Sequence, residues 1–218
     1  MTNPIYRETE KIKNIYNHQR NDIAARLSEF DEIWKTGDDE TLFAELVFCL
    51  LTPQSKAKSC WAAVKRLEDK ELLLKGNENE IARELNIVRF RNNKARYIVE
   101  ARQNLLGNGA SLKATLKRFS SSYRAREFLV ENVKGLGYKE ASHFLRNIGL
   151  GNNLAILDRH ILKNIVHLGV IDELPRSLSP KKYLEIERKM AKFAEKVGIP
   201  TAHLDILLWC KETGEIFK

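Results

Sequence analysis

The residues of this sequence best suited to covalent chemistry are Lys139 and Asp158, which lie 19 positions apart. A lysine amine can attack an electrophilic carbon and form a Schiff base once it has lost its proton. Lys139 is predicted to lie in the first turn of a helix within a cationic stretch, and both surroundings disfavour an added positive charge. A carboxylate such as Asp158 can stabilise positive charge that develops on the reacting atoms. The alternative for Lys139 is an exposed helix lysine. Asp158 is expected to cap the next helix as well, and the alternative is that it does nothing else.

Two glycines precede the candidate lysine in the segment KGLGYK, residues 134–139. Gly135 and Gly137 are both expected to adopt positive φ angles, which would allow a very tight connection between two helices. The apolar segment REFLVENV comes before them and the amphipathic segment YKEASHFLRNIG includes the residues after them. Exposed amides at such a turn favour a phosphate group. The pattern predicts a helix-hairpin-helix motif, with an ordinary turn between helices as the alternative.

Positive charge is concentrated around this motif. The 218 residues carry a formal charge of +8, which suits a polyanionic partner without identifying it. Residues 112–149 hold eight Lys and Arg against three acidic residues, and residues 86–106 hold five against one. These two neighbourhoods are the predicted contact with a phosphate backbone, and a solvated helix surface is the alternative.

The elements that must position these residues are predicted to be helices. Apolar residues recur with helical spacing along most of the chain, and no alternating strand pattern is convincing. Turn-forming segments divide this pattern into about ten helices, so the predicted fold class is all-α. The segment 148–156 contains two glycines and two asparagines and is the predicted domain boundary.

Other classes of protein and of site are disfavoured by composition. The charged opening and the short apolar run LVFCLL predict a soluble protein with no membrane segment, located in the cytoplasm. Cys49, Cys60 and Cys210 are isolated in apolar stretches, so we expect buried free thiols rather than a metal cluster. The histidines lack a metal-binding motif. The sequence therefore predicts no metal and no cofactor.

The hairpin followed by an aspartate resembles the helix-hairpin-helix DNA glycosylase superfamily. The missing four-cysteine loop argues against its endonuclease III-like members. The segments FCLLTPQSKAKSCW, RFRNNKARYI and HLDILLWCKETGEIFK look like the short archaeal-type, or type 2, 8-oxoguanine DNA glycosylase/AP lyase family. The resemblance covers essentially the whole chain and implies two helical domains with an active-site cleft between them. One domain would comprise residues 37–150 with the hairpin, and the other residues 1–36 plus 151–218.

The resemblance also implies an activity. Such an enzyme flips 8-oxoguanine out of double-stranded DNA, excises it through a Schiff base with Lys139 assisted by Asp158, and then cleaves the strand by β-elimination. The expected partner is DNA containing oxidised guanine, and the expected state is a monomer. Two alternatives stay open: a glycosylase for another damaged base, and a non-catalytic helix-hairpin-helix protein that needs the glycines but neither Lys139 nor Asp158.

Five further residues take expected roles from this resemblance. Gln54 would fill the gap left by the flipped nucleotide, and Arg89 and Phe90 would lie near the opposite base, although Phe90 could also be a core aromatic. Trp209 would offer an aromatic face to the flipped purine. Lys218 would bring its ammonium and the terminal carboxylate close, and a carboxylate can accept the N7–H that 8-oxoguanine has and guanine lacks.

Overall fold

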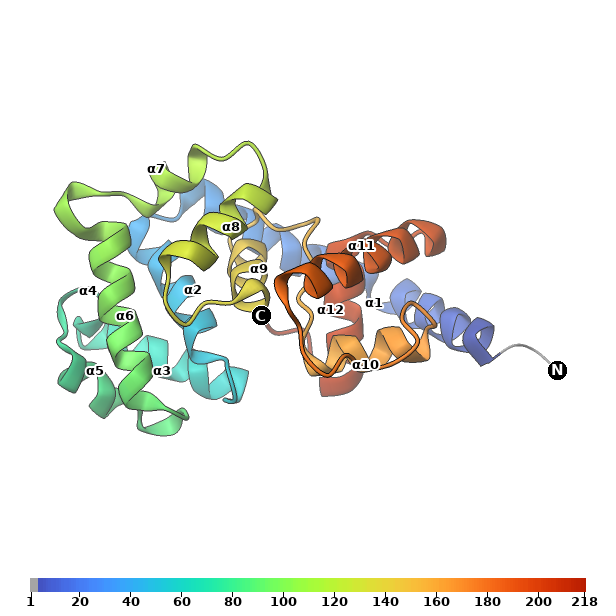
Figure 1. Ribbon diagram of the computed structural model, residues 1–218, viewed down its shortest axis with the longest axis horizontal. Coiled ribbons are helices and arrows are strands. Elements are labelled where there is room, and N and C mark those ends of the chain that lie inside the picture. The colour runs from blue at the N-terminus through green and yellow to red at the C-terminus, as the bar shows by residue number, and fades with distance from the viewer. Residues whose placement is uncertain (1–3) are drawn as a thin grey trace.

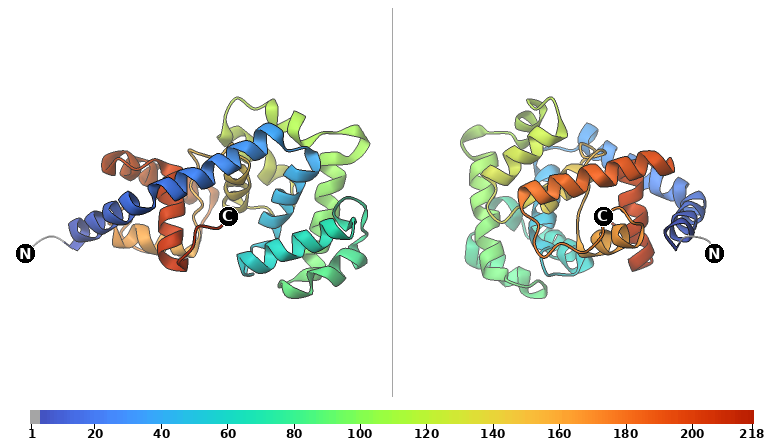
Figure 2. Two further views of the ribbon diagram at one scale, coloured as in Figure 1. Left: turned by 180° about the vertical axis from the view of Figure 1, so that it is seen from behind. Right: turned by 45° about the vertical axis from the view of Figure 1, so that its right-hand side comes forward.

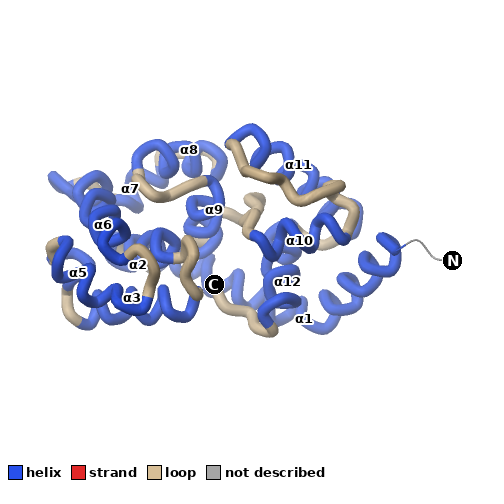
Figure 3. Tube along the Cα trace, turned by 60° about the horizontal axis from the view of Figure 1, so that its bottom comes forward, coloured by secondary structure: helices blue, strands red, loops and turns tan. Residues whose placement is uncertain are grey.

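The computed structural model describes residues 4–218, and in that range the chain forms helices and loops without a strand (Figure 3). The predicted all-α class is confirmed. Short helices with too few residues for a clear periodic pattern raise the helix number of this range above the predicted ten. The α-helices are α1 (Pro4–Thr36), α2 (Asp39–Leu51), α3 (Ala57–Asp69), α4 (Leu72–Lys75), α5 (Glu78–Glu84), α6 (Arg91–Leu106), α7 (Leu112–Lys117), α8 (Ser122–Asn132), α9 (Tyr138–Asn147), α10 (Arg159–His167), α11 (Pro180–Val197) and α12 (Thr201–Thr213), with 3-10 turns at Leu85–Ile87 and Gly107–Gly109.

The buried apolar side chains form two clusters. One runs from Leu42 to Leu154 and includes α2, α3, α6, α8 and α9. The other combines residues of α1, such as Ile12 and Phe30, with residues from Ala155 to Leu208. We propose that these clusters are the cores of the two predicted domains, because each buries its apolar side chains separately.

The long helix α1 joins the two groups of helices that contain these two clusters. It runs along the back of the molecule and reaches both groups (Figures 1 and 2), and it contacts α12, α9 and α2. Its Ile23 belongs to the second cluster, whereas Trp34 near its end packs against the first. A single continuous helix thus restricts how the two groups can move relative to each other.

The predicted boundary segment 148–156 is packed against its surroundings. Gly149 has a φ of 75°, and a Cβ there would lie 2.7 Å from the Cα of Asp31 on α1. Glu187 accepts a hydrogen bond from the Ala155 amide at 2.9 Å, and Asp205 accepts one from the Ile156 amide at 3.0 Å. The chain therefore passes between the two groups of helices in a fixed path.

Two buried ion pairs cross from one group of helices to the other. Arg126 of α8 donates two hydrogen bonds to Glu187 of α11, at 2.6 and 2.8 Å. Arg146 of α9 lies 3.5 Å from Asp205 of α12. Each carboxylate also holds one amide of the boundary segment, so each pair fixes two helices and the connection between them at once.

The three cysteines are isolated in the folded chain. Cys49, Cys60 and Cys210 are free and buried, as predicted. Among residues 4–218, no three His, Cys, Asp or Glu side chains gather as a metal site would require. No helix within the described part of the chain combines the length and apolarity of a membrane span.

Candidate active site

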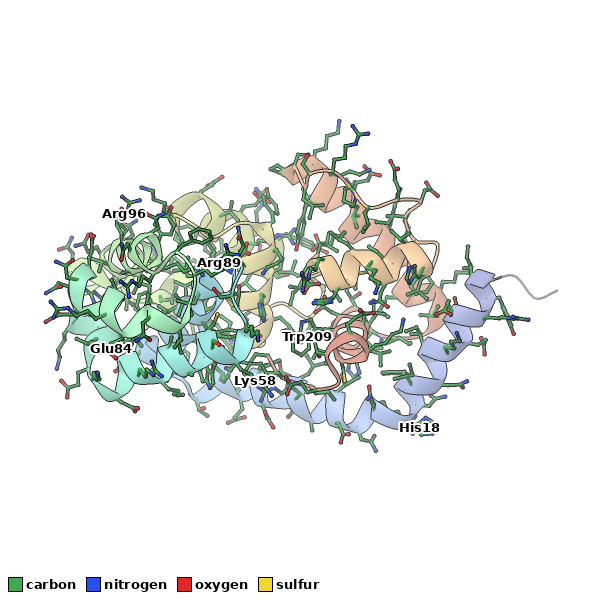
Figure 4. The ribbon with its side chains drawn as sticks, turned by 90° about the horizontal axis from the view of Figure 1, so that it is seen from below. His18, Lys58, Glu84, Arg89, Arg96 and Trp209 are labelled. Carbon is green, nitrogen blue, oxygen red and sulfur yellow. The ribbon has the colours of Figure 1, made fainter. Side chains whose placement is uncertain are left out.

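A cavity of about 900 Å³ brings together most of the predicted site residues. Its walls come from the loop between α2 and α3, from α9, α10 and α12, and from the C-terminal tail. Arg89 and Lys58 lie on one side of the opening and Trp209 on the other (Figure 4). The predicted residues that line the cavity are Gln54, Arg89, Lys139, Asp158, Trp209 and Lys218. Phe90, Gly135 and Gly137 lie outside its lining.

Lys139 enters the cavity from the first turn of α9. Gly137 is the N-cap of this helix and has no side chain, so the candidate lysine follows almost directly after the turn. The Lys139 ammonium lies 3.1 Å from a Glu140 carboxylate oxygen and donates to the Thr52 hydroxyl at 3.5 Å. About a quarter of the lysine side chain, 23%, is exposed, so the amine is reachable from the cavity. The ion pair with Glu140 was not anticipated from the sequence.

Asp158 is held at the start of α10. Its Oδ1 accepts hydrogen bonds from the amides of His160 and Ile161, each at 2.8 Å. The predicted capping role is therefore confirmed. The same two bonds fix the orientation of the carboxylate, which lines the same cavity as Lys139 although the two residues belong to separate helices.

Asp205 is a buried cavity residue that sequence reasoning missed. It accepts the amide of Ile156, two residues before Asp158, and faces Arg146. Burial raises the pKa of Asp205 to about 7, while Arg146 and the Ile156 amide act in the opposite direction. A single acid in the apolar segment TAHLDILLWC was the available signal, because a lone buried carboxylate needs a partner.

The hairpin has only one glycine with a positive φ. Gly135 adopts 86°, and a Cβ there would lie 2.5 Å from the ring of Tyr97. Gly137 adopts a φ of −90°, so the expectation of a left-handed conformation at this position is wrong. An N-cap residue takes an extended backbone conformation, which any residue can adopt. Both glycines are exposed on the surface, where a backbone phosphate could approach the turn.

The loop between α2 and α3 presents Gln54 in an unusual conformation. Gln54 has a φ of 56° and is exposed at the cavity. On the turn before α6, Phe90 has a φ of 58° and is 53% exposed, which excludes the core-aromatic alternative. The Arg89 guanidinium lies 5.3 Å from the centre of the Phe90 ring. These three side chains thus stand on two turns outside the core.

Lys218 lines the cavity in a way that the sequence did not predict. Its ammonium is not free beside the flipped base: it forms a buried ion pair with Glu45 and lies 3.7 Å from the centre of the Trp61 ring. The side chains of Lys218 and Glu45 are only 7% and 3% exposed. The carboxylate that balances this buried ammonium lies 173 residues away in the sequence. The side chain therefore anchors the tail.

His143 supports the end of the chain from α9. Burial lowers the pKa of His143 well below the usual 6.5; the charges of Arg146 and Lys139 act in the same direction, and the backbone of Lys218 acts in the opposite direction. The ring is therefore neutral near pH 7. Trp209 on α12 is half-buried and lines the same cavity.

Several cations of the two basic neighbourhoods are buried or hydrogen-bonded to other parts of the protein. Arg126, Arg146 and Lys94 are buried. Lys113 donates to the carbonyls of Lys35 and Gly37, at 3.3 and 2.6 Å, and is not available to a phosphate. The cations that are exposed and can contact a phosphate backbone are Arg89, Arg91, Arg96, Lys117, Arg118, Arg124 and Lys134. The predicted footprint is therefore smaller than the sequence charge suggested.

Comparison with known proteins gives a consistent picture. The family model described as 8-oxoguanine DNA glycosylase matches residues 23–199. The chain is 49% identical over 209 residues to the 8-oxoguanine DNA glycosylase/AP lyase of Fusobacterium nucleatum, covering 95% of this chain and 96% of that one. It is 39% identical to the Methanocaldococcus jannaschii enzyme of the same name, covering 96% and 98%.

Solved structures are similar over the same length. The crystal structure of the 8-oxoguanine DNA glycosylase of Thermotoga maritima matches with a TM-score of 0.87 and 35% identity, over 98% of this chain and 100% of that one. The M. jannaschii 8-oxoguanine glycosylase/lyase in complex with a 15-mer DNA containing 8-oxoguanine matches with a TM-score of 0.87 and 37% identity, over 96% and 99%.

Proposed function

Because this chain belongs to the 8-oxoguanine DNA glycosylase family, we propose that it removes 8-oxoguanine from duplex DNA and then cleaves the strand as an AP lyase. One observation carries the assignment of the residues: Lys139 and Asp158, from separate helices, line one cavity. A helix-hairpin-helix protein that only binds DNA would need neither of them. The similar M. jannaschii protein was crystallised with DNA containing this lesion, which supports the substrate.

Lys139 acts as the nucleophile. Its neutral amine attacks C1′ of the damaged nucleoside, a C1′–N bond forms, and the bond to the base breaks with its electron pair leaving on the base. Ring opening gives a Schiff base, and loss of a C2′ proton then expels the 3′ phosphate. Because the ammonium contacts Glu140 and Thr52 in the free protein, the amine leaves these partners before it attacks.

Asp158 stabilises the positive charge that develops on the sugar as the base departs. Its two amide hydrogen bonds hold the carboxylate in place before the substrate arrives. The hydrogen bond from Ile156 to Asp205 and the pair of Asp205 with Arg146 support the backbone just before it. Such preorganisation matters because the electrostatic effect depends on where the charge is held.

The end of the chain reads the base. Trp209 offers one ring face to the flipped purine, and the terminal carboxylate of Lys218 accepts the N7–H of 8-oxoguanine. Guanine has a lone pair at that position, so the wrong base leaves a buried acceptor facing another acceptor. The anchoring of the Lys218 side chain by Glu45 supports this role, because it fixes the last residue at the cavity wall.

The remaining contacts bind and open the duplex. Gly135 and Gly137 allow a phosphate to approach the hairpin, Gln54 fills the gap left by the lesion, and Arg89 and Phe90 contact the opposite strand. We also propose that the protein acts as a monomer, because Lys139 and Asp158 line one cavity of a single chain.

Borohydride trapping on duplexes with different lesions tests this function. Wild-type protein should be trapped on 8-oxoguanine duplex in high yield, and the Lys139→Gln variant should not be trapped while it still binds the duplex. Preferential trapping on an oxidised pyrimidine, or excision of 3-methyladenine, would show that the protein acts on another damaged base. Tight binding without excision or trapping by the wild-type protein would support the non-catalytic alternative.

A further inference from the structure

A buried lysine holds together the two turns that carry Gln54 and Arg89. Lys94 lies in the first turn of α6 and is only 4% exposed. Its ammonium donates to the carbonyls of Leu51 and Pro53, at 2.7 and 2.9 Å, and to the hydroxyl of Ser55 at 3.0 Å. All three protons of the ammonium are thus directed at the loop between α2 and α3.

The hydroxyl of Ser55 extends this contact to the second turn. It accepts a hydrogen bond from the amide of Arg89 at 3.0 Å, in addition to the bond from Lys94. Ser55 follows Gln54 directly in the sequence, and Arg89 directly precedes Phe90. One ammonium and one hydroxyl therefore tie the turn of Gln54 to the turn of Arg89 and Phe90.

Both turns contain a strained residue that needs such support. Gln54 and Phe90 have φ angles of 56° and 58°, and a non-glycine residue adopts this region only where its surroundings enforce it. Lys94 restrains the carbonyl of Pro53, just before Gln54, and the hydroxyl of Ser55, just after it. The clamp therefore acts directly on the conformation in which Gln54 faces the cavity.

Burying a charge at this position is energetically unfavourable. Lys94 is held by neutral oxygens rather than by a carboxylate, and burial lowers its pKa. An apolar side chain of similar volume often replaces a buried charge with little loss of stability. The need for three directed donors to the loop that carries Gln54 explains a lysine here better than core packing does.

We propose that Lys94 is a positioning residue for lesion extrusion: it presets Gln54 and Arg89 as one rigid unit that enters the duplex when the base leaves. Lys94 does not contact the reacting atoms, so its loss should slow opening of the duplex and leave the chemistry at Lys139 intact. This inference rests on the proposed function, because it assigns Lys94 to the base-flipping step of that reaction.

The test compares Lys94→Met with Lys113→Met, a matched control. Lys113 also donates to two backbone carbonyls, one in the last turn of α1 and one in the loop after it, but lies outside the cavity lining. Single-turnover excision is measured on 8-oxoguanine in a duplex and in a single strand, where no pair must be broken. Lys94→Met should lower the ratio of the duplex rate to the single-strand rate by about tenfold or more, since extrusion is the step affected. Lys113→Met should leave this ratio unchanged.

A second set of variants tests the same contact in case Lys94→Met does not fold. Ser55→Ala removes the shared hydroxyl and should lower the same ratio, whereas Ser55→Thr retains a hydroxyl and should restore it. An unchanged ratio in both Lys94→Met and Ser55→Ala would overturn the proposal, as would an equal change in Lys113→Met.

A readout without catalysis separates this inference from the proposed function. A duplex with a tetrahydrofuran abasic analogue beside 2-aminopurine reports local unstacking by its fluorescence. Wild-type and Lys113→Met proteins should raise the fluorescence on binding, and Lys94→Met should raise it less at saturating protein. If the wild-type protein excised nothing, the proposed function would fail while this signal still decided the role of Lys94. Equal fluorescence in all three proteins would contradict that role.

Discussion

Adding one glycine after Lys218 should impair reading of the base while it leaves the anchor of the tail in place. The extension converts the terminal carboxylate into an amide, but the Lys218 ammonium can keep its ion pair with Glu45 and its position over Trp61. The perturbation is therefore confined to the group that we assign to the N7–H of 8-oxoguanine. Deletion of Lys218 is less selective, because it would also leave Glu45 buried without its cation.

The size of the effect follows from the loss of the negative charge on the acceptor, because the new amide carbonyl of Lys218 still accepts a hydrogen bond. A hydrogen bond to a charged group contributes about 1–1.5 kcal/mol more than one to a neutral group, which corresponds to a loss of about 5- to 12-fold in excision rate. Cleavage at an abasic site should change much less, because no base has to be recognised. The melting temperature should stay close to that of the wild type, because the Glu45 pair is preserved.

Single-turnover rates on an 8-oxoguanine duplex and on an abasic duplex, at one salt concentration, provide the assay. The Lys218→Met variant is the complementary control, because it retains the carboxylate and removes the ammonium. It should lower the melting temperature, since breaking a buried pair costs up to about 3–5 kcal/mol and release of the tail limits the loss. Equal losses of the extended protein on both substrates, or no loss on either, would refute a role of the terminus in reading the base.

Three other predictions follow from the structure. Asp158→Asn should slow base excision by about 10²–10³-fold and largely retain stability, because asparagine is also a good helix cap; wild-type activity in single-turnover assays would leave only the capping role. Gly135→Ala should lower the free energy of unfolding by about 1–3 kcal/mol, because Gly135 has a positive φ and the added Cβ would collide with the Tyr97 ring. Gly137→Ala should lower the free energy of unfolding by less, and equal losses in urea unfolding would contradict this difference. Burial raises the pKa of Asp205 from 3.8 to about 7, so between these two pH values the folded protein keeps a proton that the unfolded chain releases, and stability falls over this range. Asp205→Asn should remove this part of the pH dependence of urea unfolding, and an unchanged pH profile would show that Asp205 is already ionised.

Local pattern was sufficient to predict the all-α class, the longer helices and the hairpin. Gly135, Lys139 and the start of α10 at Asp158 depend on residues close in sequence, and the structure has the turn, the helix start and the cap at these positions. Gly137 shows the limit of a glycine pattern: its neighbour Gly135 already supplies the left-handed turn, and the N-cap position requires only extended backbone.

Long-range pairing could not be predicted from local pattern. The partner of the Lys218 ammonium is Glu45, and that of Asp205 is Arg146, each far away in the sequence. A buried charge signals that a partner exists but does not identify it. For the same reason the sequence indicated that Lys94 and Lys113 bind phosphate, whereas in the folded chain their ammonium groups donate to backbone carbonyls.

The central claim is that Lys139 forms the covalent bond to DNA, and the cavity contains three competing lysines, Lys56, Lys58 and Lys218. Peptide mapping by mass spectrometry of the borohydride-reduced complex with an 8-oxoguanine duplex identifies the attached residue directly. The reduced sugar should be found on the peptide that contains Lys139 in the wild-type protein, and no adduct should form with Lys139→Gln. A sugar attached to Lys56, Lys58 or Lys218 in the wild-type protein would contradict the account.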